Sequence, residues 1–253
     1  MKQRIVLAYD GTPQGSAAIS WLAERHQADV VTLTLDAGGG IALDGIRDQS
    51  LGRGAIRAHV LEVQEEFARD VVISAAQAGT FGRDLSLTTW LRPLLARKLV
   101  DVAHIEKASA VAYVSYAADD AALEGMIAVL DPALSVIVKD AGGDDGPRPV
   151  APRRSVANAS SIATPAQVEI AFKDDVPVTV NGIAMRLPEL LESLATIASE
   201  HGIGAGAHPF SPAAAVLHVA YGARTPSRDA VVRLKLSHGA CTVCEDVTGQ
   251  VSR

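Results

Sequence analysis

The stretch that decides the fold runs from Gln3 to Leu22 and reads QRIVLAYDGTPQGSAAISWL. Residues 4–9 form an apolar run rich in β-branched side chains, typical of a buried strand, and residues 10–15 form a turn rich in Gly, Pro and Asp. From residue 16 on, apolar residues recur at the spacing of one helix face. A strand, a tight loop and a helix N-terminus direct backbone N–H groups and the positive end of the helix dipole at one place. Residues 10–16 therefore predict a phosphate cradle, or the remains of one.

The first half of the chain alternates apolar runs with helical patterns. Near-continuous apolar strands separated by helices indicate an α/β fold with a parallel five-stranded sheet and helices on both faces. The predicted strands are 5–9, 30–35, 58–61, 110–116 and 134–139, and the predicted helices are 16–25, 43–51, 64–78, 91–106 and 120–130. Ligands of such sheets bind outside the carboxyl ends of the strands. Segments 10–16, 36–40 and 116–120 should therefore surround one crevice.

After residue 140 the composition changes. Residues 142–165 are rich in Gly, Pro, Ser, Asn and charged residues without an apolar period, which indicates a linker. The segment that follows predicts short antiparallel strands at 167–172, 176–180, 231–236 and 240–243, and helices at 188–201 and 213–222. We therefore expect a domain at 1–141, a linker at 142–165 and a small α+β domain at 166–253.

The composition narrows the function classes. The 253 residues have a net charge of −6 and only 4% aromatic residues, which disfavours a nucleic-acid partner. No apolar run approaches the roughly 18–20 residues of a membrane helix, and the chain starts without the apolar segment of a signal peptide. We expect a cytoplasmic protein with no membrane partner.

The two cysteines form the pair Cys241 and Cys244 near the end of the chain. A CxxC pair suggests a redox or zinc site, but on a strand positions i and i+3 point to opposite faces. A structural zinc site also needs four ligands. We therefore interpret both cysteines as buried strand residues and assign no metal ligands.

Several segments, in the same order, resemble argininosuccinate synthases along nearly the whole chain. Residues 5–16 resemble that family's strand followed by SGGxDTS, and residues 168–182 resemble its VEIxFxxGxPVxxNG. Residues 201–204 (HGIG), 212–218 and 232–243 resemble later segments of the family. The resemblance implies a PP-loop, or adenine nucleotide alpha-hydrolase-like, fold. It also implies an ATP-dependent, AMP-forming carbon–nitrogen ligase that uses Mg²⁺ and two amino-acid subsites.

The resemblance implies an ATP site on the opening stretch. Its cofactor-binding residues would be Tyr9, Asp10, Gly11, Thr12, Gly15, Ser16 and Asp36. The loop departs from the family pattern, because Thr12 replaces a glycine and Pro13 removes an N–H donor. Asp10 adds a negative charge that repels phosphate unless a metal intervenes. The alternative interpretation is that Asp10 or Ser16 only caps the helix.

The amino-acid subsites are less well kept. The resemblance implies that the substrate-binding residues are Thr88, Thr89, Arg92, Asp119 and Asp120. However, Thr80 stands where the family has its citrulline-binding Tyr, and the citrulline-binding Arg is absent. Since the loss of one orienting contact typically costs about a hundredfold in rate, we do not expect argininosuccinate synthesis.

Two classes of function remain open. The first is a diverged, ATP-associated C–N ligase-type enzyme that acts on another amino-acid-like small molecule. The second is a pseudoenzyme with a degenerate active site, which acts as a binding, regulatory or scaffold protein with a protein partner. Either form is expected to be a homo-oligomer. An enzyme should keep a closed polar pocket beside Asp10 and Thr88, whereas a scaffold can fill it with side chains. The opening stretch also resembles that of universal stress proteins. This second resemblance supports only the prediction of a strand, loop and helix of the nucleotide-binding type.

Overall fold

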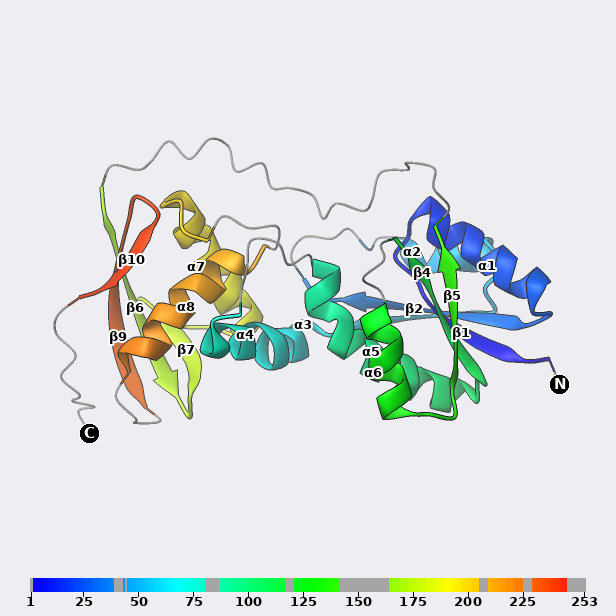
Figure 1. Ribbon diagram of the computed structural model, residues 1–253. Helices are drawn as coiled ribbons and strands as arrows, with labels where there is room; N and C mark the ends of the chain where they lie inside the picture. The colour runs from blue at the N-terminus through cyan, green and yellow to red at the C-terminus, as the bar shows by residue number, and fades with distance from the viewer. Residues whose placement is uncertain are drawn as a thin grey trace. The chain divides into compact units, whose positions relative to one another are not determined.

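The protein is described from a computed structural model and divides by its contacts into two compact units (Figure 1). The described residues are 2–38, 43, 45–80, 87–116, 121–141, 164–204, 209–224 and 229–244, without the side chains of 87–89 and 121. The first unit comprises residues 1–37, 41–63 and 91–151, and the second comprises 38–40, 64–90 and 152–253. Residues 64–90 thus group with the second unit although they lie between strands of the first in sequence. The domain boundaries at 141 and 165 stay a prediction.

The first unit contains the predicted five-stranded parallel sheet, with strand order β3-β2-β1-β4-β5. Its strands are β1 (Arg4–Ala8), β2 (Asp29–Asp36), β3 (Arg57–Glu62), β4 (Ala110–Ser115) and β5 (Ser135–Asp140). The order reverses at β1, which lies between β2 and β4. The carboxyl ends of these three strands are therefore neighbours, and a ligand crevice is expected at this edge.

Helices cover both faces of this sheet, as predicted. The helices are α1 (Pro13–Arg25), α2 (Ile46–Gly52), α5 (Leu87–Glu106) and α6 (Ala121–Leu130). Side chains of β1 alternate between two cores: Leu7 packs with Ile19 of α1, and Val6 packs with Leu99 of α5 and Ile127 of α6. Figure 1 shows the strands between α1 on one side and α5 and α6 on the other.

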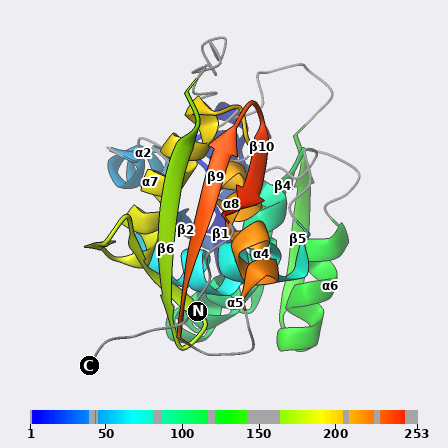
Figure 2. The ribbon, with the colours of Figure 1, turned by 90° about the vertical axis from the view of Figure 1, so that its left-hand side faces the viewer.

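The second unit contains an antiparallel sheet of order β10-β9-β6-β7-β8, packed against helices on one face. Its elements are α3 (Gln64–Glu66), the π-helix η1 (Phe67–Ile73), α4 (Ser74–Ala78), β6 (Ala166–Lys173), β7 (Val176–Val180), β8 (Ile183–Ala184), α7 (Leu187–Glu200), α8 (Ser211–Ala223), β9 (Ala230–Ser237) and β10 (Ala240–Val243). Figure 2 shows β6 and β9 side by side with α7 and α8 behind them. Buried Val168, Ile170 and Phe172 alternate along β6, which explains the period-2 pattern of the sequence.

Candidate functional site

The loop after β1 forms a tight turn that starts helix α1. Gly11 has a φ of +76°, a left-handed conformation that glycine adopts without steric cost. Thr12 is the N-cap: its side-chain oxygen accepts a 3.0 Å hydrogen bond from the Gly15 N–H, and Pro13 takes the first helical position. The capping residue is therefore Thr12, and the expectation of Asp10 or Ser16 as the cap was wrong. Proline fixes the helix start at residue 13, which leaves the preceding threonine as the cap.

The Asp10 carboxylate folds back over this turn. Its Oδ1 accepts hydrogen bonds from the Thr12 N–H at 3.0 Å and from the Thr12 hydroxyl at 2.7 Å. Its Oδ2 accepts a 2.7 Å hydrogen bond from the hydroxyl of Tyr116. Both carboxylate oxygens are therefore held in place by hydrogen bonds, one to the turn and one to the neighbouring strand end.

Tyr116, which follows β4 directly, belongs to the segment 116–120 that was expected at the crevice, but it was not among the predicted site residues. Its hydroxyl oxygen lies 2.7 Å from Asp10 Oδ2 and 2.7 Å from Thr12 Oγ1. Burial and the Asp10 carboxylate raise the pKa of the Tyr116 phenol above its ordinary value, so it stays protonated at neutral pH. The signal that could have found it is topology, because β4 pairs with β1 and brings residue 116 beside residue 10.

Few backbone donors of the cradle remain for a phosphate. The Thr12 N–H bonds to Asp10, the Gly15 N–H bonds to Thr12 Oγ1, and the Ser16 N–H bonds to the Thr12 carbonyl at 2.9 Å. Pro13 has no N–H. In this conformation the cradle does not fit a pyrophosphate, because three of its N–H donors are already used and a carboxylate occupies its mouth.

Ser16 and Tyr9 form a second, buried pair. Their hydroxyl oxygens lie 3.0 Å apart, and both residues are almost fully buried. The backbone carbonyl of Tyr9 accepts a hydrogen bond from the Thr34 hydroxyl of β2 at 2.9 Å. These contacts fix the end of β1 against α1 and β2.

The structure describes two further predicted site residues. Asp36 is the last residue of β2, at the same carboxyl edge as Asp10, and its carbonyl accepts the Val63 N–H at 2.8 Å. Arg92 is half-buried in α5. Their proposed roles in binding remain predictions.

Four further predicted substrate residues are not fully described. Thr88 and Thr89 belong to the first turn of α5, but their side chains lie outside the described part. Asp119 and Asp120 lie outside the described residues altogether.

The cysteines and potential metal ligands give no second site. Both cysteines are free and half-buried, and Cys244 lies just after β10, so the expectation of two buried strand residues was wrong for both in burial and for Cys244 in position. Burial, and then the nearby Cys244, raises the pKa of the Cys241 thiol to about 11. Across the described ranges, three or more His, Cys, Asp or Glu side chains nowhere gather in a way that could hold a metal ion.

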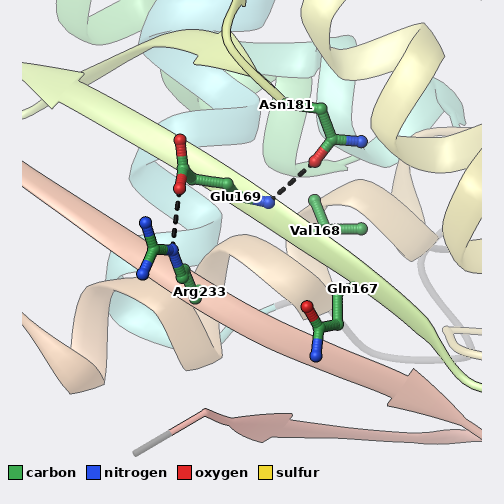
Figure 3. A pocket seen from close by; sticks show the side chains of 5 residues that line it. All are labelled: Gln167, Val168, Glu169, Asn181 and Arg233. Atoms are coloured by element: carbon green, nitrogen blue, oxygen red, sulfur yellow. Dashed lines mark hydrogen bonds and ion pairs between the residues drawn. The ribbon is translucent and has the colours of Figure 1, made fainter. Parts of the chain in front are cut away.

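The second unit has a shallow polar hollow on its sheet (Figure 3), with a volume of about 240 Å³. Its lining residues are Gln167, Val168, Glu169, Asn181 and Arg233. Arg233 pairs with Glu169 at 2.8 Å, and the Asn181 side chain accepts the Glu169 N–H at 2.9 Å. Because Arg233, Glu169 and Asn181 bond to one another in this way, we assign no ligand to the hollow.

The fold and this site define a class of protein. A parallel α/β sheet whose first strand leads through a tight turn into a helix at the reversal of strand order is typical of nucleotide-binding proteins. Residues 4–141 match the family described as "Arginosuccinate synthase N-terminal HUP domain". The chain therefore belongs to the argininosuccinate synthase family.

Known relatives cover most of the chain. It is 31% identical to an argininosuccinate synthase of Bacillus cytotoxicus and 32% identical to one of Bacillus cereus, in alignments that cover 80% of this chain. The chain spans only 63% of the length of these relatives. The solved structure of a universal stress protein from Archaeoglobus fulgidus is 14% identical to this chain and covers 55% of it, which is 93% of that protein. The TM-score is 0.30, which is too low for any conclusion about fold or function. No helix in the described part of the chain is long and apolar enough to cross a membrane.

Proposed function

We propose that this protein is a diverged, ATP-associated member of its family, which acts as a C–N ligase-type enzyme on an amino-acid-like substrate other than that of argininosuccinate synthesis. The observation that carries the proposal is the strand, turn and helix from β1 to α1, which persists at the carboxyl edge of the sheet beside the ends of β2 and β4. Relatives that bear the name argininosuccinate synthase support the reaction class. ATP, Mg²⁺, a homo-oligomeric state and a cytoplasmic location are parts of this proposal.

The proposed substrate differs from that of the family because the subsites have changed. Thr80 stands where the resemblance expects the citrulline-binding Tyr, and the matching Arg has no counterpart. When one polar partner is missing, a site built to hydrogen-bond its ligand loses a large factor in its preference for that ligand. Thr88 and Arg92 match the pattern of the family. Thr89 stands where the family has a Ser, and Asp119 and Asp120 stand where it has an Asn-Asp pair.

A second candidate function is a pseudoenzyme that binds a protein partner. The observation that favours it is the Asp10 carboxylate, which lies with Thr12 and Tyr116 in the mouth of the cradle. A scaffold protein tolerates such filling, whereas an enzyme of this class must open the cradle at each turnover. The hypothesis predicts a stable complex without nucleotide turnover.

Calorimetric titration of the full chain with ATP and with AMP, each with Mg²⁺, tests the proposal. Binding at micromolar strength that Ser16→Ala weakens at least tenfold would support it, since Ser16 shapes the end of β1. The control is Ser135→Ala, which removes an exposed hydroxyl at the amino end of β5 in the same unit. Pyrophosphate release with a panel of amino acids then separates enzyme from pseudoenzyme. The absence of any heat at millimolar nucleotide would contradict the nucleotide proposal and leave the scaffold function.

A further inference from the structure

We propose that Asp10 is a built-in occupant of the phosphate cradle, which keeps the cradle closed to free phosphate groups until its carboxylate is displaced. This inference deepens the proposed function and rests on it for the identity of the natural ligand. It makes Asp10 the residue that determines which ligands enter the cradle.

The first support is the set of hydrogen bonds that the carboxylate receives. Three donors, the Thr12 N–H, the Thr12 hydroxyl and the Tyr116 hydroxyl, hold it at 2.7–3.0 Å. Hydrogen bonds to an ionised acceptor are among the stronger ones in proteins. The carboxylate thus takes donors at the mouth of the cradle that an incoming oxyanion would need.

The second support is the space that Gly15 leaves open. A Cβ on residue 15 would lie 2.6 Å from Asp10 Oδ1, 3.3 Å from Thr12 Oγ1 and 3.3 Å from a ring carbon of Tyr9. Gly15 does not need its conformational freedom here, because the residue lies in α1 with ordinary helical geometry. The missing side chain makes room for the carboxylate.

The third support is the charge. In the part of the chain that the structure describes, Asp10 forms no ion pair with a Lys or Arg side chain. A carboxylate and a phosphate within a few ångströms of each other repel, and because Asp10 is exposed, water weakens this repulsion without removing it. A phosphate therefore enters only when the Asp10 side chain leaves or its charge is removed.

Titration of inorganic pyrophosphate in EDTA tests the proposal with three variants of the full chain. Asp10→Ser removes both the occupant and its charge, and Asp10→Asn removes the charge but keeps a side chain that can accept the Thr12 N–H. The matched control, Glu24→Gln, removes one exposed carboxylate at the opposite end of α1. Circular dichroism melting confirms that each variant is folded.

We expect Asp10→Ser to bind pyrophosphate at least tenfold more tightly than the wild type and Glu24→Gln. An Asp10→Asn affinity equal to that of Asp10→Ser supports closure by charge, and one equal to the wild type supports closure by occupancy. If Asp10→Ser binds pyrophosphate no better than the wild type, the proposal is wrong.

Titration of the same proteins with ATP in the presence of Mg²⁺ separates this inference from the proposed function. If the wild type binds no ATP while Asp10→Ser gains pyrophosphate binding, the proposed function fails and the closure by Asp10 stands. If the wild type binds ATP and Asp10→Ser gains nothing, the closure fails and the proposed function stands. If the wild type binds no ATP and Asp10→Ser gains no pyrophosphate binding, both the proposed function and the closure by Asp10 are wrong.

Discussion

The Asp10 carboxylate lies so close to Gly15 that a Cβ on the glycine would be 2.6 Å from Asp10 Oδ1. Contacts that short do not occur between a methyl group and an oxygen, so these two positions depend on each other. An acid at position 10 can fold over the turn only because position 15 has no side chain.

Gly15→Ala tests this dependence by a double-mutant cycle with Asp10→Ser. Alanine improves helix propensity by about 1 kcal/mol but forces the carboxylate out of its hydrogen bonds. We expect Gly15→Ala to destabilise the wild type by about 1 kcal/mol and to stabilise the Asp10→Ser variant, as measured by urea unfolding. Equal effects in both backgrounds would contradict the contact, because coupled neighbours are non-additive.

Tyr116→Phe removes the hydroxyl that bonds to Asp10 Oδ2 and contacts Thr12 Oγ1. We expect a loss of about 1 kcal/mol in unfolding free energy, the usual contribution of such a bond. In the Asp10→Ser background the loss should be less than half as large. Tyr221→Phe, which removes a hydroxyl bonded to the Asp175 carbonyl in the second unit, is the control and should show no such dependence on residue 10.

Glu106 forms a buried ionic cluster at the opposite, amino-terminal edge of the first sheet. Its carboxylate, 1% exposed, accepts hydrogen bonds from Arg57 at 2.7 Å and Arg4 at 3.3 Å, and lies 2.8 Å from His59 Nε2. Burial alone would raise the pKa of Glu106, but the hydrogen bonds with His59 and Arg57 and the charge of Arg57 outweigh burial and lower this pKa from its ordinary value.

Glu106→Gln should therefore destabilise the protein in a pH-dependent way. When the pKa of a carboxyl is lower in the folded than in the unfolded state, the group stabilises the protein at any pH above its unfolded-state pKa. This contribution is lost as the pH falls through the folded-state pKa. We expect a cost of about 3 kcal/mol at pH 7, since removal of one partner of a buried pair is expensive, and a smaller cost at an acidic pH below the folded-state pKa of Glu106. Urea unfolding at the two pH values measures it, and a cost that is the same at both would contradict the ionic role of Glu106.

Cys241 should react slowly with alkylating reagents. Because its pKa is about 11, only roughly one thiol in a thousand is ionised at pH 8. We expect its alkylation by iodoacetamide, followed by mass spectrometry, to accelerate about tenfold per pH unit between pH 8 and 10. Cys241→Ser should abolish this slow phase, and complete reaction at pH 8 at the rate of a free thiol would refute the expectation.

The sequence predicted most of the fold because its periodicity is clear. The β-branched run before Asp10 and the period-2 pattern of residues 168–172 became β1 and β6 with shifts of one residue at their ends. The predicted helix at 64–78 exists, but its middle is the π-helix η1, which side-chain periodicity does not distinguish from an α-helix. The grouping of residues 64–90 with the second unit depends on tertiary contacts that chain order does not contain.

The site was less predictable from sequence. Asp10 was predicted as a charge at the cradle, but its contact with Tyr116 joins residues 106 positions apart and depends on the pairing of β1 with β4. The alternative interpretation placed the cap at Asp10 or Ser16 because both are good capping residues. The structure places Pro13 at the first helical position, so that Thr12 is the cap.

The ratio of the dissociation constants of AMP and ATP, measured without metal for the wild type and for Asp10→Ser, tests the central claim most directly. If Asp10 closes the cradle, the two additional phosphates of ATP make no favourable contacts in the wild type. ATP should then bind no more tightly than AMP. In Asp10→Ser, ATP should bind at least tenfold more tightly than AMP. A wild type that already prefers ATP by tenfold or more would contradict the account.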